Sequence, residues 1–141
     1  MPVLETEFLL GLRKKDKKHG LSTSILEIAK DRSKDLAICG SAFVELGVGL
    51  RGSLNKSEII ATMESLYALT SSIKEIPLRS TILIYGLVIE QTLGISNLFD
   101  CLHAATALSH DSIIISDDNF YDEVPNLRRV SLRDFAKAEH S

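Results

Sequence analysis

The sequence contains little cysteine, no long apolar run and no excess of positive charge. Its two cysteines, Cys39 and Cys101, form no CxxC pair, which favours buried free thiols in a reducing compartment. The longest apolar run, from Ile82 to Ile89, is far shorter than the ~20 residues that span a bilayer. The net charge of −3 argues against a broadly basic nucleic-acid scaffold, although it allows a local basic patch.

Motifs of several other protein classes are also missing. Acids at Glu5 and Glu7 make the N-terminus unlike a secretory signal, so we expect a cytoplasmic protein without a membrane partner. The histidines show no HExxH or zinc-finger spacing, and no GxSxG nucleophile motif is present. Residues 47–52 formally match GxGxxG, but a dinucleotide site requires a strand directly before that motif. Here it follows an expected helix, and glycines at the end of that helix are the better interpretation.

The composition that is present is that of a globular α/β protein. The 141 residues are 45% hydrophobic and 25% charged, so we expect one domain, residues 1–141, with its own core. Short apolar runs alternate with helical patterns, which predicts a three-layer α/β/α fold around a mostly parallel, twisted sheet of about five short strands. The expected strands are Val3–Leu4, Leu36–Cys39, Glu75–Pro77, Ile113–Ile115 and Arg129–Ser131.

Start signals and apolar spacing predict the helices between these strands. Ser41 has the character of an N-cap, and Asn55 to Glu58 has the spacing of a capping box, as does Asn97 to Asp100. The segment from Ser80 to Gln91 is apolar on most sides, which predicts a buried helix. We expect helices over residues 6–12, 22–30, 41 to about 47–52, 55–71, 80–91 and 97–109, with a charged loop over 13–19.

Acidic residues fall at the expected ends of the strands. Glu5 follows the first strand, Glu45 lies in the first turns of the helix after the second, and Asp100 begins the helix that leads into the fourth. Asp117 and Asp118 follow the fourth strand directly. Taken singly, each acid has an ordinary role on a helix surface, in a first turn or in a loop. Because functional groups of parallel sheets collect at the carboxyl ends of strands, their joint placement predicts one site.

The type of side chain in this site predicts a hard divalent cation. Mg²⁺ and Mn²⁺ prefer oxygen ligands, and a ring of acids without a cation repels itself. Such ions bind phosphodiester oxygens and activate water, so no histidine or cysteine nucleophile is needed. We therefore predict a metal site made by Glu5, Glu45, Asp100 and the aspartates that follow the fourth strand, Asp117 and Asp118.

Four stretches of the sequence resemble one family over nearly the whole chain. The segments VLETEFLLGL, SAFVELGVGL, FDCLHAATALSHDSIIIS and SDDNFY are similar to those of the PIN domain, particularly of VapC-type toxin ribonucleases. The resemblance implies a Mg²⁺- or Mn²⁺-dependent endoribonuclease that acts on RNA. It also implies a frequent role as a toxin with an antitoxin partner, and a frequent homodimer. It assigns the metal to Glu5, Glu45, Asp100 and Asp118, and leaves Asp117 as a candidate fifth ligand or outer-shell acid. Thr6 and Ser116 support the site, and Tyr121 is the closing aromatic residue.

One departure from the family keeps alternatives open. The first acid of the family is usually Asp, whereas Glu5 is longer by about one C–C bond, and catalytic geometry is sensitive at that scale. The alternatives are a weak or inactive PIN-like module that binds RNA or protein, and an RNA-processing nuclease unrelated to toxin–antitoxin systems. A response-regulator-like domain is a third interpretation, but no convincing lysine follows a fifth strand.

Two further features have a functional and a plain structural interpretation. His103 lies one helical turn after Asp100, where it either orients that acid or is simply packed. A basic cluster beyond Glu5 either contacts RNA phosphates or is a solvated loop. The cluster comprises Arg13, Lys14, Lys15, Lys17 and Lys18, of which Arg13, Lys14 and Lys15 are the candidate RNA contacts.

Overall fold

Five parallel strands form a single sheet in the computed structural model, which describes residues 1–31 and 35–140. Of the expected domain 1–141, residues 32–34 and 141 lie outside the described part. The strand order is β3-β2-β1-β4-β5. The predicted three-layer α/β/α fold is confirmed, with strand bounds within one residue of those expected. The strands are β1 (Val3–Leu4), β2 (Ala37–Cys39), β3 (Lys74–Ile76), β4 (Ile113–Ile115) and β5 (Arg128–Val130).

The centre of the sheet is its most apolar part. Val3 of β1 pairs with Ala37 on one side and with Ile114 on the other, and all three side chains are buried. Continuous apolar strands of this kind are typical of parallel sheets covered on both faces. The strand order reverses between β1 and β4, which are adjacent in space although far apart in the chain. This switch point is where ligand sites of open α/β sheets usually lie.

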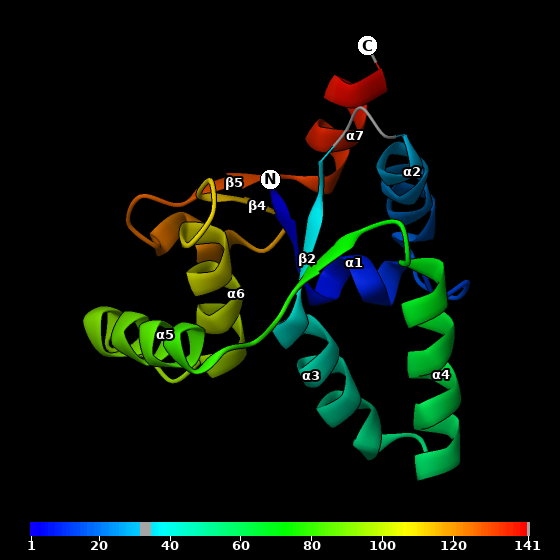
Figure 1. The fold of residues 1–141 in the computed structure, drawn as a ribbon, viewed down its shortest axis with the longest axis horizontal. Helices are drawn as coiled ribbons and strands as arrows, with labels where there is room; N and C mark the ends of the chain where they lie inside the picture. The colour runs from blue at the N-terminus through cyan, green and yellow to red at the C-terminus, as the bar shows by residue number, and fades with distance from the viewer. Residues whose placement is uncertain (32–34, 141) are drawn as a thin grey trace.

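The helices cover both faces of the sheet (Figure 1). One group, on the right of the view, is α1 (Thr6–Gly11), α2 (His19–Lys30) and α7 (Leu132–His140). The other, on the left, is α5 (Ser80–Leu93) and α6 (Leu98–Leu108). Three further elements extend beyond the carboxyl end of β2: α3 (Gly40–Gly49), the 3-10 turn η1 (Leu50–Gly52) and α4 (Lys56–Leu69). A second 3-10 turn, η2, spans Asn119–Glu123.

Helix starts agree with the sequence in one place and differ in two others. The capping box at Asn55 is confirmed, because the Asn55 side chain accepts from the Glu58 amide and the Glu58 side chain accepts from the Asn55 amide. The prediction of Ser41 as an N-cap is wrong: α3 begins at Gly40 with Cys39 as its cap. Asn97 does precede α6, but its side chain makes no capping bond and instead donates to Asp100. The GxGxxG segment forms the end of α3 and η1, with no strand before it.

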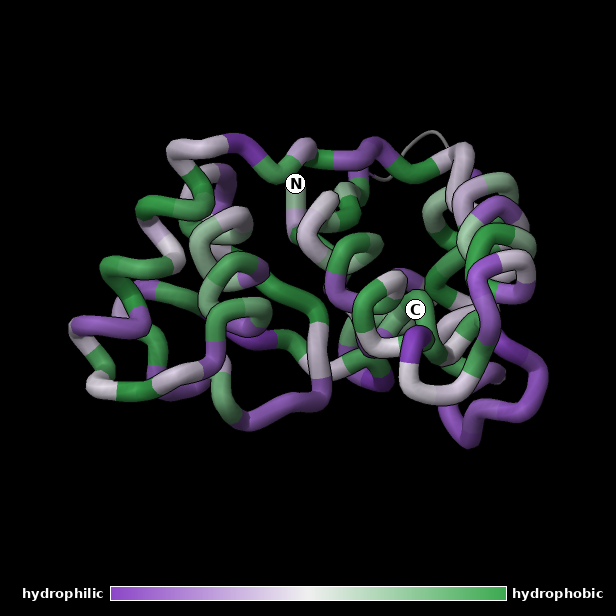
Figure 2. Tube along the Cα trace, turned by 90° about the horizontal axis from the view of Figure 1, so that it is seen from below, coloured by the Kyte–Doolittle hydropathy of each residue, from purple (hydrophilic) through white to green (hydrophobic). Residues whose placement is uncertain are grey.

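The prediction that α5 is buried is wrong. Only Ile82, Gly86 and Ile89 are buried, while Ile84 is 60% exposed and Val88 is 50% exposed. The helix is apolar on most sides but packs along one stripe, mainly against α6. Figure 2 shows hydrophobic stretches, in green, on the left, where these helices lie. In the described part of the chain no single helix is long and apolar enough to cross a membrane, and α5 with α6 meets that criterion only as a pair bent by 114°.

The close approach of α3 to the chain after β3 generates a prediction. A Cβ atom on Gly40 would lie 2.8 Å from the Ile76 carbonyl oxygen and 3.0 Å from the Leu78 amide nitrogen, both backbone atoms. We expect Gly40→Ala to destabilise the protein by about 2 kcal/mol, because overpacking against rigid atoms forces a backbone shift. Gly20→Ala, whose Cβ meets nothing within 4 Å, is the control and should be neutral or slightly stabilising. Urea unfolding measures both, and equal midpoints would contradict the packing described here.

Candidate metal centre

The carboxyl end of the sheet opens into a pocket of about 800 Å³. Residues from four separate stretches of the chain line it, including the acids that follow or face β1, β2 and β4. The predicted metal acids therefore share one space, as the parallel-sheet argument requires. The acidic members are Glu5, Glu7, Asp16, Glu45, Asp100 and Asp118, with Thr6 between the first two.

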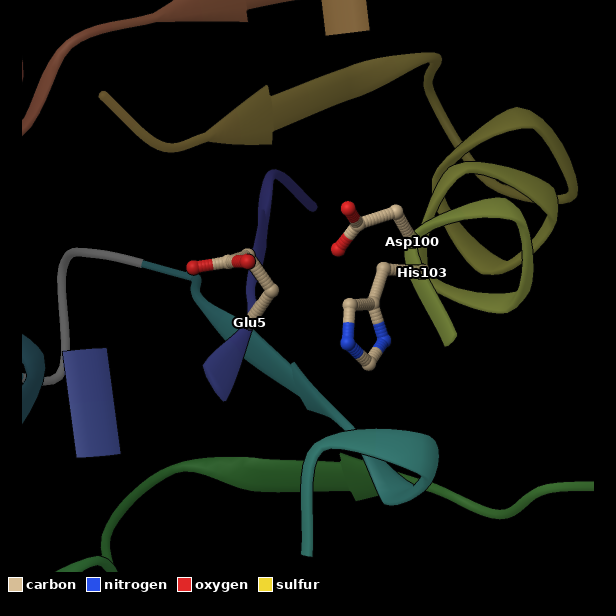
Figure 3. Close-up of side chains that lie close together, drawn as sticks. All are labelled: Glu5, Asp100 and His103. Carbon is tan, nitrogen blue, oxygen red and sulfur yellow. The ribbon is translucent and has the colours of Figure 1, made fainter. Parts of the chain in front are cut away.

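Three side chains, of which Glu5 and Asp100 line this pocket, are close enough to share one ion. Figure 3 shows Asp100 and His103 projecting from α6 into the space beside Glu5, which stands at the end of β1. One potential ligand atom from each lies within 4.8 Å of those of the other two. Glu45 joins this group through His103, since its Oε1 lies 2.9 Å from His103 Nε2.

Glu5 is almost fully buried and is held at both carboxylate oxygens. Oε1 accepts the Glu7 amide at 2.7 Å, which makes Glu5 the N-cap of α1. Oε2 accepts the Tyr121 hydroxyl at 3.1 Å. That hydroxyl also lies 3.3 Å from Asp100 Oδ1, although it has only one proton to donate. Burial, followed by the charges of Glu5 and Asp100, raises the pKa of Tyr121, so the hydroxyl stays protonated.

Burial dominates the ionisation of Glu5. It raises the pKa of this carboxyl from 4.5 to about 8, against the lowering effect of the Glu7 amide. The neighbouring charges of Glu7 and Asp100 add to the rise, while the Tyr121 hydrogen bond opposes it. Without a cation, Glu5 is therefore largely protonated at neutral pH, and a cation must displace that proton in order to bind it.

The carboxylate of Asp100 is half-buried and, like that of Glu5, lies close to other negative charges. Burial raises its pKa, and the negative charges of Glu45 and Asp118 contribute to the rise. The Asn97 amide opposes this by donating to Oδ2 at 2.7 Å, and the position of Asp100 in the first turn of α6 favours its charge. The influence of Glu45 and Asp118 indicates that three of the predicted metal acids act on one another electrostatically.

The pKa of Glu45 is shifted in the opposite direction to those of Glu5 and Asp100. Burial raises the pKa of its carboxyl, but hydrogen bonds from His103 and Thr6 outweigh burial and bring it below the usual value. Both bonds end on Oε1. The interpretation that His103 orients Asp100 therefore needs correction. The described hydrogen bonds of its ring go to Glu45, Thr6 and Ser41, and Glu45 lies 58 residues earlier in the chain.

The loop after β4 separates the two neighbouring aspartates. Asp118 lines the pocket, accepts the Phe120 amide at 2.9 Å, and donates its own amide to Ser116 Oγ at 3.0 Å. Asp117 is not among the described residues that line the pocket. It accepts Lys18 Nζ at 2.8 Å and the Leu132 amide at 3.0 Å. Asp117 thus ties the loop to α2 and α7, and Ser116 holds the backbone that presents Asp118.

The basic cluster contributes to the mouth of the pocket in part. Arg13, Lys17 and Lys18 line it. Lys14 and Lys15 are not among the described residues that line it. Lys18 is already paired, since Nζ also lies 3.1 Å from Glu7 Oε2. Arg13 and Lys17 are exposed and face the same opening as the acids.

Sequence reasoning missed the contacts by which several residues support the site. Glu7 and Lys18 form its rim, Asn97 donates to Asp100, and Ser41 contacts His103 Nδ1 at 2.7 Å. The position of Glu7 in the first turn of α1, two residues after Glu5, was the one local signal available. The other contacts join elements far apart in the chain and leave no local pattern.

The donor set fits a hard divalent cation. Four carboxylates and a threonine hydroxyl offer oxygen ligands. Burial, followed by neighbouring negative charges, raises the pKa of Glu5 and Asp100, and a cation would offset both effects. No cysteine joins them, because Cys39 is fully buried and burial raises the pKa of its thiol above the physiological range. The chemistry of the set favours Mg²⁺ or Mn²⁺ over a thiolate-binding metal.

Comparison with known proteins finds one matching family model. The sequence model of the PIN domain matches residues 3–127. No curated protein matches the chain in sequence.

Three solved structures illustrate the likeness of the fold. VapBC from Salmonella typhimurium, bound to DNA, superposes with a TM-score of 0.69 and 16% identity over 94% of this chain and 99% of that one. VapBC2 from Rickettsia felis, bound to a DNA fragment from its promoter, superposes with a TM-score of 0.68 and 19% identity over 92% of this chain and 96% of that one. A toxin–antitoxin complex from Klebsiella pneumoniae superposes with a TM-score of 0.65 and 17% identity over 94% of this chain and 98% of that one.

The ionisation of Glu5 predicts a pH dependence of stability without metal. The folded chain keeps the Glu5 proton up to about pH 8, whereas the unfolded chain loses it near 4.5. The folded state therefore binds more protons in this window, and the free energy of unfolding falls as pH rises through it. Glu5→Gln removes this loss, so its stability relative to the unsubstituted protein should rise by about 3 kcal/mol from pH 5 to pH 8.

Urea unfolding in EDTA at several pH values measures this difference. The control is Glu64→Gln, which removes an exposed carboxylate on α4, and its stability difference should stay constant across the range. Parallel pH profiles for Glu5→Gln and the unsubstituted protein would show that Glu5 titrates normally.

Proposed function

This chain belongs to the PIN domain family, and from that premise we propose that it is a metal-dependent endoribonuclease and the toxin of a toxin–antitoxin pair. The observation that carries the proposal is the pocket in which Glu5, Glu45, Asp100 and Asp118 meet at the switch point of the sheet. A pocket with this concentration of carboxylates is costly without a cation, which favours a working site over a structural one.

The four acids would hold Mg²⁺ or Mn²⁺, with Asp117 outside the ligand set as the partner of Lys18. When bound, such an ion polarises a phosphoryl oxygen and lowers the pKa of water. Glu45 is ready to bind because its lowered pKa keeps it ionised. Glu5 is held in place by Tyr121 and the Glu7 amide, and it releases a proton on metal binding. Thr6 and Ser116 hold Glu45 and the Asp118 backbone.

The substrate that suits the mouth of this pocket is a phosphate backbone. Arg13 and Lys17 line the opening and are exposed, so they would bind phosphates on either side of the acids. Lys14 and Lys15 lie next to them on the same exposed loop and extend this basic surface. RNA is the substrate that the family resemblance implies. The buried free thiols of Cys39 and Cys101 suit the reducing cytoplasm in which RNA would be met.

Two exposed apolar surfaces suit the proposed protein partners. The α5 surface, made of Leu83, Ile84, Leu87 and Val88, is a candidate homodimer interface. The α3–α4 surface, made of Val44, Val48 and Ile60, borders a pocket of about 410 Å³ and is a candidate site for an antitoxin segment. The solved relative from Klebsiella pneumoniae is itself a toxin–antitoxin complex, which supports an antitoxin partner here.

The longer first acid favours one competing function, a PIN domain that binds RNA or protein without cutting. In that case the Glu5 carboxylate, held by Tyr121 and the Glu7 amide, would serve as a cap of α1 and not as a ligand. The two functions differ in their response to Mn²⁺. A ligand role predicts a rise in the melting temperature on addition of Mn²⁺ that Glu45→Gln abolishes, whereas a binding module predicts no shift at millimolar metal.

Removal of two acids tests the nuclease directly. We expect the purified protein to cleave RNA with Mn²⁺ or Mg²⁺ and to stop in EDTA. Asp100→Asn combined with Asp118→Asn should lower the rate by ~100-fold or more, because several kcal/mol of charge stabilisation is lost. The rate is measured by gel analysis of a labelled RNA.

The matched control removes two carboxylates elsewhere, with Glu64→Gln and Asp134→Asn, both exposed and remote from the pocket. It should keep full activity. Cleavage retained in the Asp100 and Asp118 variant would remove these residues from the site, and cleavage retained in EDTA would remove the metal.

The α5 surface predicts the oligomeric state. Ile84→Lys combined with Val88→Lys should weaken a homodimer on the order of 100-fold, because like charges would face each other across a two-fold interface. Light scattering after size-exclusion chromatography measures the mass. Ile60→Lys, on α4, changes an equally exposed apolar residue and should leave the dimer intact. A monomer before any substitution, or equal loss in both variants, would contradict the assignment of α5.

A further inference from the structure

Behind Glu45 lies a short chain of buried polar groups that the proposed chemistry does not use. His103 and Ser41 are 0% and 1% exposed, and Thr6 is 8% exposed. His103 Nδ1 lies 2.7 Å from Ser41 Oγ, and Nε2 lies 2.9 Å from Glu45 Oε1 and 3.1 Å from Thr6 Oγ1. The ring therefore connects the first turn of α3 with the carboxylate in its second turn, through a residue of α6.

The chemistry of the partners fixes the direction of these bonds. A Glu45 carboxylate that binds a cation has only acceptor atoms, so Nε2, the ring nitrogen that lies 2.9 Å from Oε1, must carry a proton that points at it. The Thr6 hydroxyl also donates to Oε1, which leaves its oxygen free to accept from the same Nε2–H. At the other end of the ring, the Ser41 hydroxyl is able to donate to Nδ1. A ring with a bare Nε2 would instead place a lone pair against the carboxylate.

We propose that Ser41 and His103 are positioning residues for Glu45, in which the serine hydroxyl holds the ring with Nε2–H toward the carboxylate and the ring fixes that carboxylate for a divalent cation. The inference rests on the proposed metal site. It gives a role to the small polar residue two positions after β2, which from the sequence alone has the character of a helix cap.

This arrangement places His103 outside the ligand set, although its ring is near enough to be counted in it. A ligand atom of His103 lies within 4.8 Å of ligand atoms of Glu5 and Asp100. Nε2 is the nitrogen on the Glu45 side, and its hydrogen bond occupies the lone-pair position that a metal would need. Nδ1 is engaged with Ser41. The cation is thus bound by oxygen alone, which suits Mg²⁺ and Mn²⁺.

Fixing one carboxylate oxygen has a measurable consequence for affinity. Both donors contact Oε1 of Glu45, and the side chain is still 32% exposed where it lines the pocket. Partners of this kind that orient a ligand typically account for 10–100-fold in metal affinity. Removal of the Ser41 hydroxyl frees the ring to turn or to change tautomer, so Glu45 would lose a fixed donor although Ser41 itself never meets the metal.

The test compares two buried serines by calorimetric titration of Mn²⁺. Ser41→Ala should weaken Mn²⁺ binding about tenfold. Ser22→Ala is the matched control, since Ser22 is equally buried and its hydroxyl has no hydrogen-bond partner among the described residues. It should bind Mn²⁺ as the unsubstituted protein does. Melting temperatures in EDTA identify any variant that has lost its fold, and pulsed electron paramagnetic resonance of bound Mn²⁺ should show no directly bound nitrogen.

Nitrogen-15 NMR of the metal-free protein reads the ring itself. The proton of His103 should lie on Nε2 in the unsubstituted protein, and Ser41→Ala should shift the Nδ1 resonance. Equal Mn²⁺ affinity in both serine variants, a bare Nε2 or a nitrogen ligand on Mn²⁺ would each overturn the positioning role. Absence of Mn²⁺ binding to the unsubstituted protein would instead remove the metal site, and with it the proposed function.

Discussion

Carboxyl groups gathered at one end of a sheet repel one another, and the surrounding structure supplies a proton donor for each of them. Tyr121 and the Glu7 amide donate to Glu5, Asn97 donates to Asp100, and the Phe120 amide donates to Asp118. Glu45 receives the donors of His103 and Thr6. These donors reduce the cost of the crowding without removing it, because the pKa of Glu5 and of Asp100 remains raised. A divalent cation bound among these carboxylates would offset their remaining repulsion.

The fold brings these donors and acceptors together through the order of its strands. β1 and β4 are neighbours, so the residues after them meet, although more than a hundred positions separate Val3 from Ile114. α6 begins at the same edge and presents Asp100 and His103 from its first two turns. The close backbone contact at Gly40 sets where α3 leaves the sheet, and therefore where Glu45 lies. Packing far from the pocket thus determines the spacing of its acids.

Much of this could be predicted from the sequence, because strand ends and acids are local features. The short strand-like segments, three of them wholly apolar, predicted the sheet, and their ends predicted which acids share the pocket. Other predictions failed where one pattern has two outcomes. Asn97 and Asp100 have capping-box spacing, yet the amide donates to the acid instead of accepting from the helix. Apolar residues lie on most sides of α5, so the sequence does not indicate which side packs against the core. Nothing near His103 in the sequence indicates a hydrogen-bond partner on α3.

The central claim is that Glu5, Glu45, Asp100 and Asp118 bind one or two divalent cations between them. An anomalous difference map from crystals of the full chain soaked in Mn²⁺ tests it most directly. The account predicts a strong peak among these four carboxylates, with oxygen ligands at bonding distance and no bond to His103 or Asp117. A map without a peak in this pocket, or with Mn²⁺ bound only elsewhere, would contradict it.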